Sequence, residues 1–102
     1  EYHGVRTAWH GPGDISPIGV VANMHIDLSI SNFGIQEYTP MNDALREVFP
    51  GCPEIDQGYA YLNDRPGLGI DIDEEKAKKF PVAGGLPSWT NARLPDGTAA
   101  RP

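Results

Sequence analysis

The sequence has one cysteine, few basic residues and no long apolar run, and each scarcity excludes a class of protein. Because Cys52 is the only cysteine among 102 residues, neither an internal disulfide nor a thiolate metal cluster can form. Eight lysines and arginines against fourteen acids give a net charge of −6, which argues against a nucleic-acid-binding surface. The longest largely apolar run, residues 15–30, is interrupted by asparagine, histidine and aspartate, so we expect neither a membrane span nor a signal peptide. A cytoplasmic setting fits these absences.

The length allows at most one small domain with a modest core. The 12 glycines and 10 prolines gather mainly after residue 50, which predicts many turns and irregular connections in the second half. The first residue is glutamate rather than methionine, and it leads almost directly into a predicted strand. We therefore expect the chain to begin within a longer protein.

Residues 5–38 carry the pattern of a strand–helix–strand unit. β-Forming residues predict a short strand at 5–9, and residues 33–38 form a second strand-like run. Between them, Ser16 and Pro17 predict the N-cap and first position of a helix that ends near residue 29 and is apolar around most of its surface. Such a unit gives parallel strands, which are found almost only in sheets covered on both faces. We therefore expect a larger α/β sheet around this unit.

The rest of the chain predicts shorter elements. They are a helix that Asn42 or Asp43 caps and that ends at residue 48, a strand or hairpin arm at 59–62, an acidic-to-basic helix at 70–80, and a short strand near 92–94.

Three polar residues follow the two main strands. His10 and Asp14 come after the first strand, and Glu37 comes near the end of the second. Neighbouring parallel strands end at one rim, where α/β proteins bind ligands, so we expect the three side chains there. A histidine beside carboxylates can hold hydroxyl groups of a polar substrate and transfer a proton. In the alternative interpretation, His10 packs on Trp9, Asp14 supports the turn before the helix, and the glutamate is an exposed strand-end acid.

The other histidines and two aromatic residues are expected to be packed or exposed, and not to act as catalytic or metal-binding groups. His25 lies in the helix interior and is expected to pack, His3 is expected to be exposed, and the three histidines match no recognised zinc spacing. Tyr38 and Trp89 are expected to be packing residues.

Several stretches resemble the C-terminal part of the mannonate/gluconate dehydratase family of the enolase superfamily, the group of mandelate racemase and muconate lactonizing enzyme. They are Arg-Thr-Ala-Trp-His-Gly-Pro-Gly-Asp-Ile-Ser-Pro-Ile-Gly at 6–19 and Asn-Phe-Gly-Ile-Gln-Glu-Tyr at 32–38. Residues 66–73 and 93–98 resemble the closing segments of that family. The resemblance covers nearly the whole chain, in the order of the family.

The resemblance implies an α/β fold, the C-terminal part of a modified (β/α)8 TIM-type barrel with a separate capping domain. Residues 1–50 would supply the last two strand–helix units of the barrel, and residues 51–102 would form a segment running back toward the capping domain. We also expect the parent protein to be a homo-oligomer that binds neither nucleic acid nor membrane.

The resemblance further implies a hydro-lyase in the full-length parent, which converts D-mannonate or D-gluconate to 2-keto-3-deoxy-gluconate. A base removes the proton next to the carboxylate, Mg²⁺ steadies the enediolate, and the β-hydroxyl leaves. His10 would be catalytic, and His10, Asp14 and Glu37 would bind the sugar acid. The carboxylates that bind Mg²⁺ in the family lie on earlier strands, so we assign no metal ligand to this chain.

The end of the chain departs from the family, and it leaves the substrate open. Many family members carry a tryptophan after an Asp-Gly-Thr sequence, whereas residues 96–98 are followed here by Ala-Ala-Arg-Pro. Gluconate or another sugar acid is therefore as consistent with the sequence as mannonate. Two other hypotheses stay open: a non-catalytic binding or regulatory relative of the starvation-sensing type, and an independent small βαβ domain with a sugar-binding loop.

Overall fold

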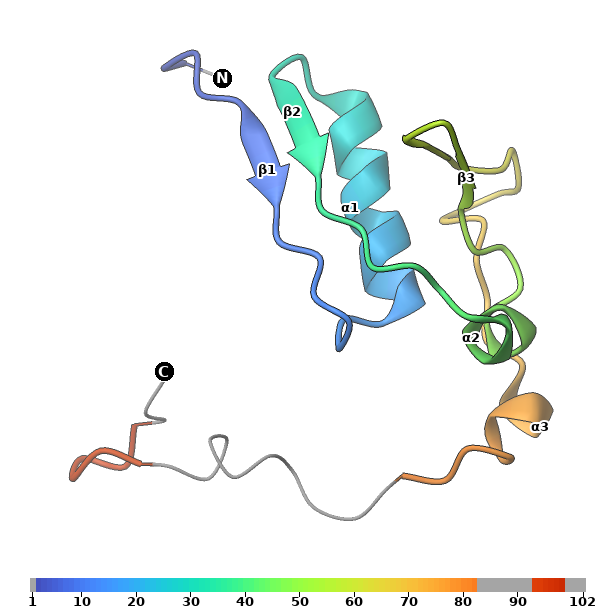
Figure 1. The fold of residues 1–102 in the computed structure, drawn as a ribbon. Helices are drawn as coiled ribbons and strands as arrows, with labels where there is room; N and C mark the ends of the chain where they lie inside the picture. The colour runs from blue at the N-terminus through green and yellow to red at the C-terminus, as the bar shows by residue number, and fades with distance from the viewer. Residues whose placement is uncertain (1, 83–92, 99–102) are drawn as a thin grey trace.

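The computed structural model describes residues 2–82 and 93–98. Its elements, in chain order, are β1 (Thr7–Trp9), α1 (Pro17–Ser29), β2 (Phe33–Gln36), α2 (Asp43–Val48), β3 (Glu54–Asp56), β4 (Tyr59–Tyr61) and α3 (Glu74–Ala77) (Figure 1).

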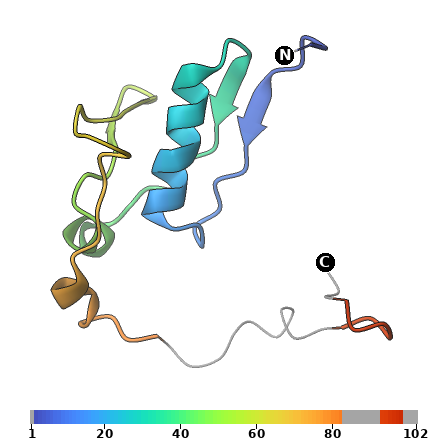
Figure 2. The same cartoon turned by 180° about the vertical axis from the view of Figure 1, so that it is seen from behind.

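The first half of the chain is the expected βαβ unit. β1 and β2 pair in parallel, and α1 lies beside this sheet in both views (Figures 1 and 2). Both strands are shorter than predicted, and ahead of β1 the Val5 carbonyl accepts from the Asn32 side chain, through Nδ2 at 2.8 Å. The parallel pair and its crossover helix are nevertheless confirmed.

Helix α1 begins where the sequence predicts. Ser16 is its N-cap and accepts a hydrogen bond from Gly19 N at 3.1 Å, and Pro17 occupies the first helical turn. In the described part of the chain, one side of this helix is buried. The buried residues form one stripe, whereas Leu28 remains 76% exposed. The stripe consists of Pro17, Val20, Val21, Met24 and Asp27.

A small core joins α1 to the second half of the chain. Its buried members, which partly buried apolar side chains surround, are Val20, Met24, Met41 and Cys52. Tyr38 packs against this cluster, as expected. Burial raises the pKa of the Cys52 thiol, whose Sγ lies 3.1 Å from the Phe49 carbonyl oxygen. The thiol is therefore a packing group and not an activated nucleophile.

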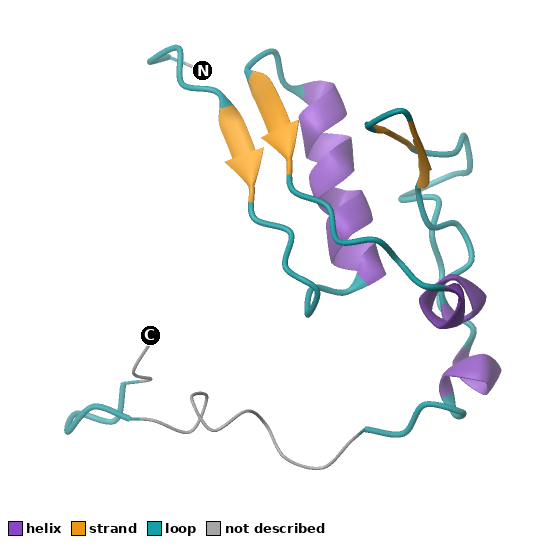
Figure 3. Ribbon diagram, viewed as in Figure 1, coloured by secondary structure: helices purple, strands orange, loops and turns teal. Residues whose placement is uncertain are grey.

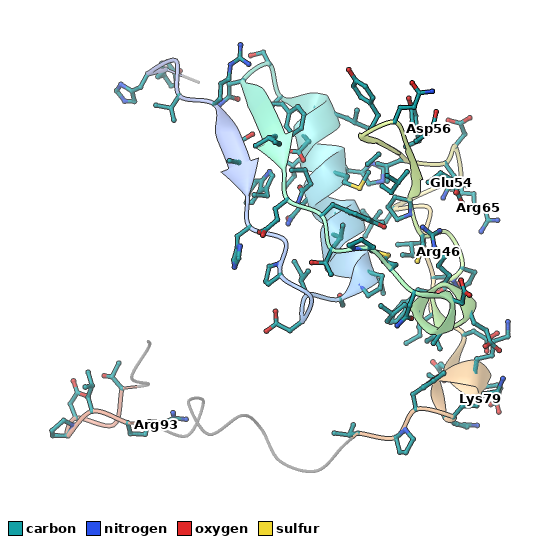
Figure 4. All side chains as sticks on the ribbon, viewed as in Figure 1. Arg46, Glu54, Asp56, Arg65, Lys79 and Arg93 are labelled. Atoms are coloured by element: carbon teal, nitrogen blue, oxygen red, sulfur yellow. The ribbon has the colours of Figure 1, made fainter. Side chains whose placement is uncertain are left out.

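The second half is built around helix α2 and a hairpin. Asn42 caps α2 as predicted, accepting from Leu45 N at 2.9 Å. Arg46 of α2 then links the helix to β3: its Nη2 donates to the Pro53 carbonyl at 3.1 Å, and its Nη1 lies 3.7 Å from Glu54 (Figure 4). β3 and β4 pair in antiparallel, so the predicted strand at 59–62 is confirmed and gains a partner.

The helix predicted at 70–80 is wrong in length, since α3 is a single turn that Asp73 caps. Backbone bonds to the preceding segment hold residues 70–73 extended instead: Asp71 N donates to the Pro50 carbonyl at 3.1 Å, and Asp73 N donates to the Val48 carbonyl at 2.8 Å. Most of the described chain after α2 is irregular backbone (Figure 3), in agreement with its glycine and proline content.

The predicted strand near 92–94 is described only in part. Arg93 forms an isolated bridge, while Leu94 N bonds the Thr98 carbonyl at 2.8 Å in a turn. Ala92 and Trp89, for which packing was expected, lie outside the described residues. Within the described ranges, no helix is long and apolar enough to cross a membrane.

The isolated 102-residue chain should be poorly soluble, because large apolar side chains and strand edges meet solvent. Ile35 of β2 is 67% exposed and Tyr59 of β4 is 69% exposed, and each sheet of the described chain has two strands. We expect aggregation in size-exclusion chromatography and strong binding of a hydrophobic dye. A monomer that unfolds cooperatively would contradict this and would support the independent βαβ domain.

Candidate functional site

The candidate site lies where the chain leaves β1 and β2. Because the two strands are parallel, their C-terminal ends point the same way (Figure 3). Pairing continues one residue past the strands, where Glu37 N donates to the Trp9 carbonyl at 3.2 Å. His10 directly follows β1 and Glu37 directly follows β2, so both residues start at the same rim.

His10 and Glu37 form a direct pair at this rim. His10 Nδ1 lies 2.6 Å from Glu37 Oε2, although the two side chains are 79% and 55% exposed. The exposure of His10 does not agree with the alternative in which it packs on Trp9. If Nδ1 carries a proton, it donates to the carboxylate, and the other ring nitrogen, Nε2, is left for a second partner.

Gly11 makes the close approach possible. Its N–H donates to Glu37 Oε2 at 2.8 Å, and a Cβ on Gly11 would overlap the Glu37 carbonyl oxygen. A larger residue would force the two loops apart. The Gly11 N–H is also the main reason that the pKa of Glu37 is lowered from its ordinary value of 4.5, and the bond to His10 adds to it. The carboxylate is therefore ionised at neutral pH.

The hydroxyl of Thr39, in the segment after β2, makes a further bond to the segment after β1. Its Oγ1 donates to the Gly11 carbonyl at 2.9 Å. We name the three bonds that link His10 and Gly11 to Glu37 and Thr39 the rim clasp. Thr39 was not among the residues predicted for the site, although a hydroxyl two residues beyond a rim carboxylate is a usable signal.

A second missed contact lies behind the rim. Trp9 Nε1 donates to Oδ1 of Asp27, a buried residue of α1, at 2.7 Å. Burial raises the pKa of Asp27, and the bond from Trp9 opposes that rise. An aspartate within a largely apolar helix was the sequence signal that could have indicated this contact.

Asp14 is placed apart from the clasp. It is exposed, in a turn that the bond from Ile15 N to the Pro12 carbonyl closes at 3.1 Å. Across residues 2–82 and 93–98, no hydrogen bond or ion pair joins Asp14 to the clasp. This position suits a turn residue, and a substrate-binding role for Asp14 stays a prediction.

The other histidines lie away from the rim. His25 Nε2 contacts the Leu68 carbonyl oxygen at 3.1 Å and is partly buried, and His3 is exposed as expected. In the described part of the chain, no three His, Cys, Asp or Glu side chains converge as metal ligands do. Glu37 Oε2 already accepts from His10 and Gly11, so these residues do not fit a Mg²⁺ site.

The Glu37 carboxyl should titrate below pH 4.5. Because its pKa is lower in the folded state, the clasp stabilises fully above the ordinary value and loses this effect as pH falls through the folded value. A ¹³C NMR titration of the Glu37 carboxyl carbon in the full-length parent measures this. In His10→Ala, most of the depression should persist, because Gly11 is the larger cause. A carboxyl that titrates at or above 4.5 would contradict the clasp.

Replacing the Thr39 hydroxyl should loosen the loop. Thr39→Val keeps the shape of the side chain but removes the donor to the Gly11 carbonyl, whereas Thr39→Ser keeps the donor. A hydrogen bond of about 1 kcal/mol predicts roughly fivefold faster hydrogen exchange at the Gly11 amide in the valine variant. The serine variant should stay near the wild-type rate. Equal rates in valine and wild type would show that Thr39 does not hold the loop.

Comparisons with known proteins identify relatives of similar sequence and fold. A D-galactonate dehydratase family member from Salmonella virchow is 81% identical over all 102 residues, which cover 24% of that relative. An enolase from Pantoea ananatis, solved with bound D-gluconate and Mg, is 78% identical with a TM-score of 0.83, over 99% of this chain and 24% of that one. A mandelate racemase/muconate lactonizing enzyme from Jannaschia sp. CCS1 is 25% identical with a TM-score of 0.66, over 79% and 20% of the two chains.

The chain thus spans about a quarter of the length of these proteins. The family described as enolase C-terminal domain-like matches residues 1–76, which include both parallel strands and the whole rim clasp. The resemblance to the enolase superfamily is confirmed by this match. The chain belongs to the enolase C-terminal domain-like family.

Proposed function

We propose that this chain is the C-terminal part of a Mg²⁺-dependent dehydratase of six-carbon sugar acids, in which it forms the substrate-holding wall. The relatives named as D-galactonate dehydratase family members support the reaction class. The structure solved with D-gluconate and Mg supports the substrate class and the metal. Between the two expected substrates, that neighbour favours D-gluconate over D-mannonate.

The observation that carries the proposal is the 2.6 Å contact of His10 Nδ1 with Glu37 Oε2 at the ends of neighbouring parallel strands. The ionised carboxylate orients the imidazole, so its Nε2 is the atom offered to a substrate. Glu37 accepts two of the three clasp bonds on Oε2, and its Oε1 suits the hydrogen of a substrate hydroxyl.

Dehydration removes a proton from the carbon next to the carboxylate and a hydroxyl from the next carbon. The enol that results becomes the 2-keto-3-deoxy acid when it takes up a proton. We assign to His10 the proton that the leaving hydroxyl needs in order to depart as water, given from Nε2 of the imidazolium. Asp14 would bind another hydroxyl from the turn beside the clasp.

The metal and the remaining parts of the enzyme would come from elsewhere in the parent. The described residues do not fit Mg²⁺, so its ligands belong to other segments of the longer protein. The family match ends at residue 76, and we propose that residues 51–102 run back toward the capping domain. The base that takes the first proton is not assigned to this chain.

In the full-length parent, His10→Ala should lower turnover of the sugar acid by about 100-fold or more, the usual contribution of a positioned acid or base. Affinity for Mg²⁺ should stay within about twofold of the wild-type value. His10 bonds Glu37, and in the described chain neither residue belongs to a group of metal ligands. Steady-state formation of the 2-keto-3-deoxy acid and metal titration by calorimetry measure the two quantities.

The matched control is His3→Ala, since His3 is an exposed histidine away from the clasp. It should leave both quantities unchanged. A large loss of Mg²⁺ affinity in His10→Ala would place this loop on the metal side of the site. A wild-type parent that dehydrates none of D-gluconate, D-mannonate and D-galactonate, yet binds one of them, would instead support the non-catalytic relative.

A further inference from the structure

Asp27 is an unusual member of the buried stripe of α1. It is the charged residue among apolar ones, it is 8% exposed, and its Oδ1 accepts from Trp9 Nε1 at 2.7 Å. Its other oxygen, Oδ2, is buried without a hydrogen-bond partner among the described residues. Burying a carboxylate in this way is unfavourable, so stability alone favours an apolar side chain at this position. An apolar residue at this position could not accept the hydrogen bond from Trp9.

Trp9 connects this bond to the rim through its backbone. Its carbonyl accepts from Glu37 N at 3.2 Å, and the next residue is His10. Trp9 reaches α1, and His10 directly follows it; because neighbouring side chains of an extended chain point to opposite faces, we expect the His10 side chain on the other face. A rotation of the strand end about its own axis would therefore move the Trp9 indole and the His10 imidazole together.

In the described chain, the other bonds that hold this strand end all lead to β2 and to the segment that follows it. β1 has three residues, pairs with β2 alone, and contains an irregularity between Thr7 and Ala8. The bond to α1 adds a contact perpendicular to the strand pairing, and it thereby limits rotation. We propose that Asp27 is a positioning residue: through Trp9 it fixes the end of β1 and so holds His10 against Glu37. The inference rests on the proposed function of that pair.

The experiment uses the full-length parent and compares two substitutions at one site. Asp27→Leu fills the same space and removes the acceptor, whereas Asp27→Asn keeps an oxygen that can accept from the indole N–H. We expect kcat to fall about tenfold or more in the leucine variant, because small misplacements of catalytic groups have large effects, and KM to change less than twofold. The asparagine variant should recover most of kcat.

Two further variants separate positioning from damage to the core. Trp9→Phe removes the donor, and combined with Asp27→Leu it should lower kcat no further than either change alone, since both break one bond. Met24→Leu alters the same buried stripe without touching Trp9, and should shift the thermal midpoint while kcat stays constant. Additive effects of Trp9→Phe and Asp27→Leu would overturn the proposal.

The ¹⁵N chemical shifts of the His10 ring, measured without substrate, give a readout independent of activity. They should change in Asp27→Leu and return toward wild type in Asp27→Asn. Unchanged shifts and kcat in Asp27→Leu, with only a shifted thermal midpoint, would show a purely structural role and overturn the inference. If the wild-type parent proves inactive on sugar acids, the proposed function fails, and the ring shifts still decide whether Asp27 positions His10.

Discussion

The register of β1 against β2 is the constraint on which the site depends. Thr7 pairs with Phe33, and an unbroken ladder from there would place Gln36 opposite His10. The irregularity after Thr7 inserts one residue into β2, so Trp9 pairs with Gln36 and the next residue, Glu37, meets His10. The inserted residue is Gly34, where a Cβ would lie 2.6 Å from the Thr7 carbonyl oxygen.

Two glycines therefore set the geometry from the backbone. Gly34 allows the register shift inside the sheet, and Gly11 allows the loops to touch beyond it. The His10–Glu37 pair itself adds little to fold stability, because both groups are exposed and water screens their attraction. Its position is consequently a result of strand pairing and not its cause. In a complete parent that covers this rim, the same contact would act in a lower dielectric and gain strength.

The sequence was sufficient for the features with local causes. Ser16 and Pro17 define the start of α1, and the two strand-like runs around it predict a parallel pair with His10 and Glu37 at one rim. Contacts between distant segments were not predictable in this way. The predicted length of α3 was wrong, because backbone bonds from Asp71 and Asp73 to Pro50 and Val48 outweigh the local helix pattern. The partners of Gly11 likewise depend on a register shift that periodicity cannot reveal.

The charge of the clasp also decides how a sugar acid would lie against it. Glu37 is an anion whose Oε2 is already satisfied by two donors, so its remaining oxygen attracts hydroxyl hydrogens and repels a carboxylate. The substrate carboxylate would accordingly point away from this wall, toward the cation that the parent supplies, and the hydroxyl-bearing carbons would lie against His10. In the proposed function, this orientation would bring the imidazole to the leaving hydroxyl, and Glu37 would not compete with the metal ligands for Mg²⁺.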